Sequence, residues 1–181
     1  GATISIMPPE ESNLVSNENT IVGNTVLYGA TSGKLFASGL AGDRFAVRNS
    51  GATTVIEGCD SNGCEYMTGG VAVILGDVGD NFGAGMTGGM AFIYDKSKEF
   101  EKKVNPESVI WQSVETEYWS MFLKELVLEH LKETSSRLSK KIIDNFAEEL
   151  KNFVQVCPKE MINKLNHPIS SKIKNVSWQL I

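Results

Sequence analysis

Three cysteines and two histidines are the residues of this sequence best suited to bind a metal ion or to act as nucleophiles. Cys59 and Cys64 are separated by four residues, but no second Cys or His pair lies near them, and a structural zinc or iron–sulfur site needs about four ligands. Together with Cys157 they match no disulfide framework, which predicts reduced thiols that are buried or half-buried. His130 and His167 have no nearby Asp, Ser or Cys in the sequence that would compose a triad. We therefore predict no catalytic, cofactor-binding or metal-binding residues in this chain.

Two glycine-rich segments resemble nucleotide-binding loops as strings of letters. Gly83 to Gly88 match G-x-G-x-x-G, but that loop must open a helix whose amides hold the pyrophosphate, and here a strand is expected to follow. Gly29 to Leu35 resemble a phosphate-binding loop, yet three residues rather than four separate the glycines. In addition, Leu35 stands where a Ser or Thr must reach magnesium. Neither segment predicts nucleotide binding.

The charge distribution argues against nucleic acid or an anionic membrane as a partner. The chain of 181 residues has a formal net charge of −5; residues 1–89 hold 3 basic and 9 acidic side chains, and residues 90–181 hold 14 and 13. A nucleic-acid-binding protein normally concentrates Lys and Arg on one face. No apolar run approaches the ~18 residues of a membrane span and no signal peptide is visible. With unpaired cysteines, this predicts a cytoplasmic protein.

All 17 glycines lie between Gly1 and Gly89, and they separate short runs of β-branched and apolar residues. The sequence Met-Thr-Gly-Gly at residues 67–70 recurs nineteen residues later at residues 86–89, in each case before an apolar run. A fixed period near twenty is typical of a β-solenoid, in which equivalent residues stack from coil to coil. A sandwich or barrel of antiparallel hairpins is the alternative, but it does not require that register. We expect frequent corners at positive φ, and glycines that supply them.

The repeat also assigns side chains to the inside or the outside of the solenoid. Inward residues should form ladders from coil to coil, and outward residues should face water or a partner. The predicted inward set is Val26, Phe45, Val55, Val73 and Phe92, and the predicted outward set is Asp43, Arg44, Arg48, Glu57 and Asp77.

After Asp95 the glycines stop and helical spacing of apolar residues begins. One helix of about five turns is expected around residues 111–131, and a second from about Ser136 to Val156, ended by Pro158. The residues from Ser170 to Ile181 show no period and read as a tail or a partner-binding segment. We therefore divide the chain into a parallel β-helix at residues 1–95 and a helical extension at residues 96–181 that packs on it.

Residues 21–95 closely resemble the C-terminal glycine-repeat (GXGXG) domain of the glutamate synthase large (α) subunit. The matching motifs are YGATSG at 28–33, AGDRFAVRNSGA at 41–52, VIEGC at 55–59, GCEYMTGG at 63–70 and NFGAGMTGG at 81–89. More loosely, the resemblance continues through Asn105 and His130 and fades beyond about Pro158. It implies a mainly β fold, a right-handed parallel β-helix with a C-terminal helical extension. Because the family's solenoid has earlier coils that would precede Gly1, it also implies that the first coils are missing.

The resemblance also implies the chemistry of the parent enzyme. Glutamate synthase converts glutamine, 2-oxoglutarate and reducing equivalents into two glutamates, in nitrogen assimilation. Its amidotransferase domain, FMN and iron–sulfur cluster belong to other parts of that enzyme, so no cofactor is expected in this chain. The resemblance implies that the amidotransferase and FMN-binding domains are its partners. An exposed solenoid end could additionally join copies into an oligomer.

The main hypothesis is a non-catalytic scaffold domain that braces the catalytic domains of glutamate synthase. The first alternative is a stand-alone β-helix subunit of a split glutamate synthase or of a complex similar to formylmethanofuran dehydrogenase. An independent enzyme with its site in a solenoid groove is a third, which no His, Asp or Glu cluster supports. Polar residues at outward or corner positions are the candidates for the domain interface: Arg44, Arg48, Asn49, Glu57, Glu65 and Tyr66.

Overall fold

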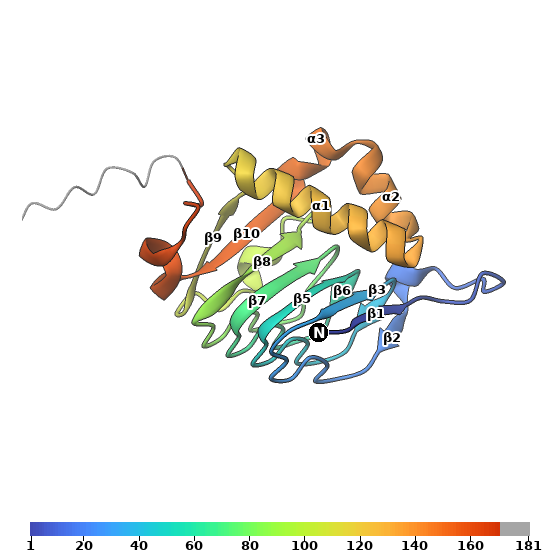
Figure 1. The fold of residues 1–181 in the computed structure, drawn as a ribbon, viewed down its shortest axis with the longest axis horizontal. Coiled ribbons are helices and arrows are strands. Elements are labelled where there is room, and N and C mark those ends of the chain that lie inside the picture. Colours follow the sequence, from blue (N-terminus) through green and yellow to red (C-terminus); the bar gives the residue numbers. More distant parts are fainter. Residues whose placement is uncertain (171–181) are drawn as a thin grey trace, which may run out of the picture.

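Parallel strands stacked coil upon coil form the body of the molecule (Figure 1). The computed structural model describes residues 1–170, so residues 171–181 of the predicted tail lie outside the described part. Five strands of the larger sheet pair in parallel and in chain order. They are β1 (Thr3–Ile6), β3 (Lys34–Ala37), β5 (Ser50–Ile56), β7 (Thr68–Ile74) and β8 (Gly88–Tyr94). The four parallel pairings between them confirm the predicted β-solenoid.

A second, narrower sheet forms another side of the coils. Its strands β2 (Thr20–Val22), β4 (Leu40–Ala41) and β6 (Gly58–Cys59) also pair in parallel. In the larger sheet, Val73 pairs with Val55 on one side and with Phe92 on the other. Residues one period apart in sequence therefore stack directly, as the repeat predicted.

Antiparallel strands cover the last coil and make the large sheet mixed. β10 (Phe153–Pro158) pairs with β8, and β9 (Val109–Ser113) pairs with β10. The predicted second helix, Ser136 to Val156, is therefore wrong from Phe153 onward, where the chain forms β10. Apolar spacing continues from Leu150 to Phe153, which suggested a longer helix, but Val154 and Val156 favour strand and the free edge of β8 supplies backbone partners.

Three α-helices lie between β9 and β10 in the sequence. The helix predicted around residues 111–131 is present as α1 (Glu117–Thr134), but its predicted start is wrong, because Trp111 belongs to β9. Ser136 caps α2 (Arg137–Asp144), which is followed by α3 (Phe146–Glu149). Short 3-10 helices complete the described structure: η1 (Ser16–Glu18), η2 (Phe100–Lys102), η3 (Leu150–Asn152) and η4 (Lys159–Lys164). None of the helices within residues 1–170 has the length and apolar character needed to span a bilayer.

Both faces of the large sheet are buried, and our prediction of which residues point into the solenoid was wrong for one face. Leu35, Ala37, Ile56, Ile74 and Ile93 belong to the core inside the solenoid. The alternate residues Phe36, Val55, Val73 and Phe92 belong to a second core, which they share with the helices. Three of the predicted inward residues, Val55, Val73 and Phe92, therefore face α1 instead, because a sheet that carries helices on its outer face is apolar on both sides.

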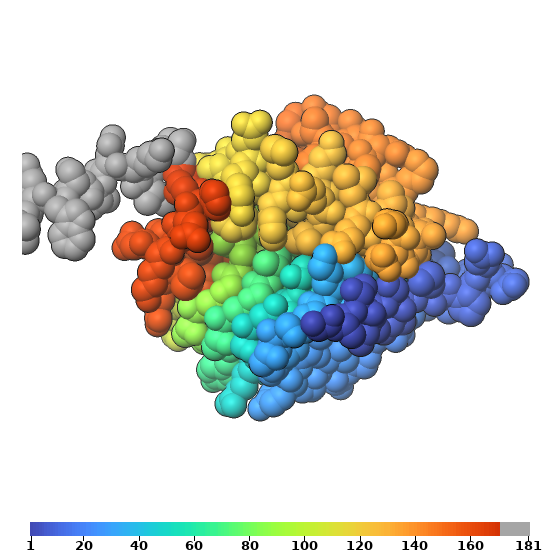
Figure 2. Space-filling view, viewed as in Figure 1, coloured from blue at the N-terminus to red at the C-terminus, as the bar shows by residue number. Residues whose placement is uncertain are grey.

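Helix α1 crosses the strands of the large sheet (Figure 1). Near its start, the ring of Trp119 lies 6.1 Å from that of Phe92 on β8. Near its end, the ring of His130 lies 6.2 Å from that of Phe36 on β3, and Glu133 accepts a hydrogen bond from Ser5 on β1. Figure 2 shows the helices, in yellow and orange, lying along one side of the blue-to-green solenoid. A single helix thus connects the first described coil to the last.

Candidate functional site

The corner of each coil is built from alternating left-handed residues. At the first such position Thr25, Arg44, Asn62 and Asn81 have φ between 59° and 62°. Two residues further on in each coil, the second left-handed position is occupied by Leu27, Ala46, Cys64 and Gly83. After another two residues, the third is occupied by Gly29, Arg48, Tyr66 and Gly85. Backbone hydrogen bonds compensate for this conformation by joining the coils. Within one corner, for example, the amide of Arg44 donates to Ser61 O at 2.9 Å in the following coil, and that of Ala46 donates to Val26 O at 2.9 Å in the preceding one.

These corners change the explanation for the glycines. Nine of the twelve left-handed corner positions carry side chains, so the expectation that glycine supplies positive φ at the corners is largely wrong. Gly69 shows what glycine does instead. A Cβ atom there would lie 2.3 Å from the carbonyl oxygen of Ser50 in the preceding coil. Close stacking of coils, rather than backbone freedom, requires glycine at this position.

Four of the six predicted interface residues lie on the corner that faces solvent. Arg44, Arg48 and Tyr66 are exposed and Glu65 is half-buried. The guanidinium of Arg48 lies 5.9 Å from the ring of Tyr28 and 6.0 Å from that of Tyr66, in the neighbouring coils. We call Tyr28, Arg48 and Tyr66 the corner triplet. Tyr and Arg are the residue types most enriched at binding hot spots, so the triplet has the composition of a docking surface.

The other two predicted interface residues are buried within the chain. Asn49 holds the turn that leads into β5, where its Oδ1 accepts from the amide of Ala52 at 2.9 Å and its Nδ2 donates to Ala52 O at 2.9 Å. Glu57 was predicted to face outward and is 1% exposed, so that prediction is wrong. Its Oε1 accepts from the hydroxyls of Ser38 at 3.1 Å and Ser136 at 2.5 Å. The helical part covers this position, which a repeat pattern alone could not reveal.

A buried polar network connects this carboxylate to His130. Because the carbonyl of Ala37 can only accept, Nε2 of His130 donates to it at 3.0 Å, and Nδ1 accepts from the hydroxyl of Ser139 at 2.6 Å. The amide of Ser139 in turn donates to Ser136 Oγ at 3.0 Å. Burial lowers the pKa of His130 to about 4, which keeps the ring neutral. We expected no Ser partner for His130, yet the fold brings the hydroxyl of Ser139 to its ring. Ser136 could have been recognised from the sequence as a helix N-cap, because it lies at the start of α2.

The network is fully enclosed, so it acts as a structural connection between α1, α2 and the solenoid. His130, Ser136 and Ser139 are each at most 1% exposed. A nucleophile at Ser139 would have no access to a substrate. His167, by contrast, is exposed and its ring stacks on Tyr118 with 3.5 Å between the ring centroids.

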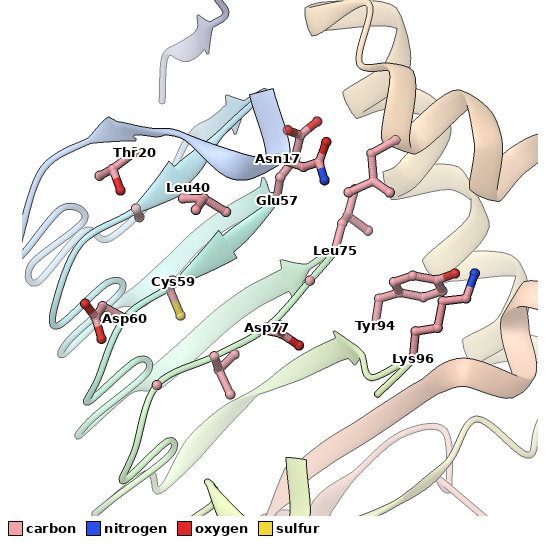
Figure 3. Close-up of a pocket in the computed structure, with 15 residues that line it drawn as sticks. Asn17, Thr20, Leu40, Glu57, Cys59, Asp60, Leu75, Asp77, Tyr94 and Lys96 are labelled. Carbon is pink, nitrogen blue, oxygen red and sulfur yellow. The ribbon is translucent and has the colours of Figure 1, made fainter. Parts of the chain in front are cut away.

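A cavity of about 460 Å³ opens beside the buried carboxylate (Figure 3). Glu57 lines it together with Asp60, Asp77, Tyr94 and Lys96. Burial and a hydrogen bond to Glu149 raise the pKa of the Tyr94 hydroxyl above its ordinary value, so this phenol remains protonated. The charged side chains of this cavity are therefore predominantly acidic, and its walls also include apolar residues such as Leu40, Leu75 and Leu138. We call it the acidic cavity.

The cysteines do not form a ligand set for an iron–sulfur cluster or a metal ion. All three are buried, and burial raises the pKa of Cys64 to about 12 and that of Cys157 to about 11. In the part of the chain that the structure describes, no three His, Cys, Asp or Glu side chains come together as a metal site would require. The donor set of these residues therefore does not fit a cluster or a metal ion.

Comparison with protein families identifies the repeat. The family described as GXGXG motif matches residues 1–159, which is most of the chain. The left-handed corner, with its alternating pattern, lies entirely within the matched region.

Individual relatives are all much longer than this chain. The "Glutamate synthase [NADPH] large chain" of Azospirillum brasilense is 59% identical over 169 residues, which is 93% of this chain and 11% of the relative. "Glutamate synthase [NADH]" of Schizosaccharomyces pombe is 48% identical over 88% of this chain and 8% of the relative. "Ferredoxin-dependent glutamate synthase 2" of Synechocystis is 46% identical over 87% of this chain and 10% of the relative. The chain thus spans about a tenth of the length of these relatives.

Proposed function

The chain belongs to the GXGXG motif family, and from this premise we propose that it is the β-solenoid scaffold of a glutamate synthase. In this role it braces the domains that carry out the reaction and has no catalytic residue of its own. The observation that carries the proposal is the 59% identity with a glutamate synthase large chain across 93% of these residues.

The parent reaction then determines the partners. We propose that the parent protein converts glutamine, 2-oxoglutarate and reducing equivalents into two glutamates. Its amidotransferase domain and its FMN-binding domain, which also holds the iron–sulfur cluster, are the neighbours of the solenoid. We assign these cofactors to other parts of the parent protein; among the described residues the three buried cysteines do not form a ligand set with other Cys, His, Asp or Glu side chains.

The arrangement of α1 supports a bracing role. The helix contacts the outer face of the sheet at both ends through Trp119 and His130, and Lys34 on β3 forms an ion pair with Glu129 at 2.6 Å. The solenoid beneath it is held by hydrogen bonds between all successive coils. A rigid body of this kind can hold two domains at a fixed separation, which internal transfer between their active sites requires.

The corner triplet is the surface that we assign to domain contact. Tyr28 and Tyr66 are 57% and 51% exposed, although both are large aromatic residues. Arg48 lies within cation–π distance of both rings. Arg44 and Glu65 lie on the same corner and supply polar contacts at its margin.

The experiment compares the isolated chain with the full-length parent enzyme. The purified 181-residue chain should show neither glutaminase activity nor 2-oxoglutarate-dependent glutamate formation, and turnover of either kind would contradict the scaffold role. In the parent, the triple substitution Tyr28→Ala, Arg48→Ala and Tyr66→Ala should expose new sites to limited proteolysis and lower glutamine-dependent activity at least ~10-fold.

Lys140→Ala provides the matched control, because Lys140 is exposed on α2 and pairs only with Asp144 among the described residues. This variant should leave both measurements unchanged. If the triple variant behaves like the control, the corner triplet is not the domain interface.

A further inference from the structure

Glu57, which lines the acidic cavity, has an unusual feature, a carboxylate oxygen without a hydrogen-bond donor among the described residues. Both hydroxyl groups near Glu57 donate to its Oε1. Its Oε2 is buried, and nothing in residues 1–170 donates to it. A carboxylate oxygen removed from water without a hydrogen-bond partner is costly, and such groups in native proteins usually have a specific reason.

The surroundings of Glu57 have an excess of negative charge. Asp60 and Asp77 are exposed on the same cavity and form no ion pair with any described residue, whereas Lys96 is the one basic residue that the described chain contributes to the lining. Asp60 accepts from the amide of Ser61, and Asp77 has one long contact of 3.4 Å with the hydroxyl of Ser97. Acidic side chains therefore outnumber basic ones around this space.

The size and position of the cavity favour a side chain that enters from outside. Its volume of about 460 Å³ exceeds what one water or one metal ion would fill. Asn17 from η1 and Leu138 from α2 lie on its walls, so it opens between the solenoid, the N-terminal segment and the helices (Figure 3).

We propose that this cavity binds an arginine side chain of the polypeptide that packs on the solenoid, with Glu57 as its innermost partner. A guanidinium presents five donors in a planar fork, so it can donate to the free Oε2 of Glu57 and still has donors left for other acceptors of the lining. A lysine ammonium is a point charge and serves such separated acceptors less well. The inference rests on the proposed scaffold role, since it assigns the chemistry by which a neighbouring domain is recognised.

The test uses small probes and the 181-residue chain. N-acetyl-L-arginine amide is titrated and followed through backbone amide NMR shifts, with N-acetyl-L-citrulline amide as the neutral probe of the same shape and N-acetyl-L-lysine amide as the point charge. We expect shifts at Asn17, Gly76 and Leu138 with a dissociation constant of about 1–10 mM for arginine. The lysine probe should bind more weakly, and citrulline should not bind.

Two variants and a control locate the binding. Glu57→Gln should weaken arginine binding at least ~10-fold, and Asp77→Asn, an exposed substitution that leaves the core intact, should weaken it by about 2–5-fold. Asp43→Asn removes an exposed acid outside the cavity and should change nothing. Equal binding of citrulline, shifts elsewhere on the chain, or unchanged affinity in both Glu57→Gln and Asp77→Asn would overturn the proposal.

This outcome is separate from that of the scaffold proposal. If the corner-triplet variant disrupts the parent enzyme but the chain does not bind the arginine probe, the assignment of a guanidinium is wrong and the scaffold role stands. If the isolated chain catalyses either half-reaction, the scaffold role fails whatever the probe does.

Discussion

His130 Nε2 lies 3.0 Å from the carbonyl oxygen of Ala37, a residue 93 positions earlier in the chain. This hydrogen bond joins the end of α1 to strand β3, and the same imidazole reaches α2 through Ser139. One neutral ring therefore holds strand β3 to two consecutive helices that are remote from it in sequence.

Stability should depend on pH through this ring. Burial lowers the pKa of His130 to about 4 from an unfolded value of about 6.5, so the folded state disfavours protonation. Its contribution to the free energy of unfolding is fully present above pH 6.5 and is lost as the pH falls toward 4, by up to about 3 kcal/mol. Urea unfolding between pH 4 and 8 measures this slope.

The control for that measurement is the second histidine. His167→Gln should keep the slope, because His167 is exposed, whereas His130→Gln should flatten it. Identical slopes in the two variants would show that another group causes the dependence.

Removal of the Ser139 hydroxyl should destabilise the protein. Ser139→Ala leaves Nδ1 of His130 buried without a donor, which costs about 1–3 kcal/mol. Ser135→Ala is the comparison, since Ser135 is exposed. Denaturant midpoints at pH 7 give the difference, and equal midpoints would mean that Nδ1 does not depend on this hydroxyl.

Glu57→Gln should behave differently from a typical core substitution. In the chain alone it removes a buried carboxyl group whose Oε2 has no partner among the described residues, while an amide oxygen can still accept from Ser38 and Ser136. We expect the free energy of unfolding to change by less than ~1 kcal/mol, or to rise. Glu57→Ala, which leaves both hydroxyls without their acceptor, should cost about 2–4 kcal/mol. A large loss in the Gln variant would indicate that Oε2 has a donor after all.

Gly85 tests the packing of the corner. Gly85→Ala places a Cβ atom 2.4 Å from the ring of Tyr66 at a φ of +64°, so backbone strain and a steric clash add, at about 2–4 kcal/mol. Gly29→Ala has nearly the same φ, +63°, and open space around its Cβ, so it should show the strain alone, about 1–2 kcal/mol. In a Tyr66→Ala background the two glycine substitutions should become equally costly; thermal unfolding measures all of these variants.

The sequence alone determined the solenoid, because its repeat places equivalent residues such as Val73 and Phe92 one coil apart, and stacked parallel strands require that register. Periodicity also located α1, whose apolar stripe is continuous. In contrast, residues 153–158 form a strand because the open edge of β8 supplies hydrogen-bond partners, and no local sequence pattern predicts that pairing. The sequence also could not predict which face of the large sheet points into the solenoid. Alternation shows that Val55 is buried, but not whether the coil interior or a helix covers it.

The functional residues divide in the same way. Arg48 and Tyr66 could be selected as exposed corner residues because they belong to the repeat itself. The burial of Glu57 and its connection to His130 were decided by the tertiary structure, since α1 and α2 fold back from more than seventy residues away to cover these coils. A charged residue in a repeat reads as solvent-exposed unless something outside the repeat packs over it, and only the folded chain shows that this happens here.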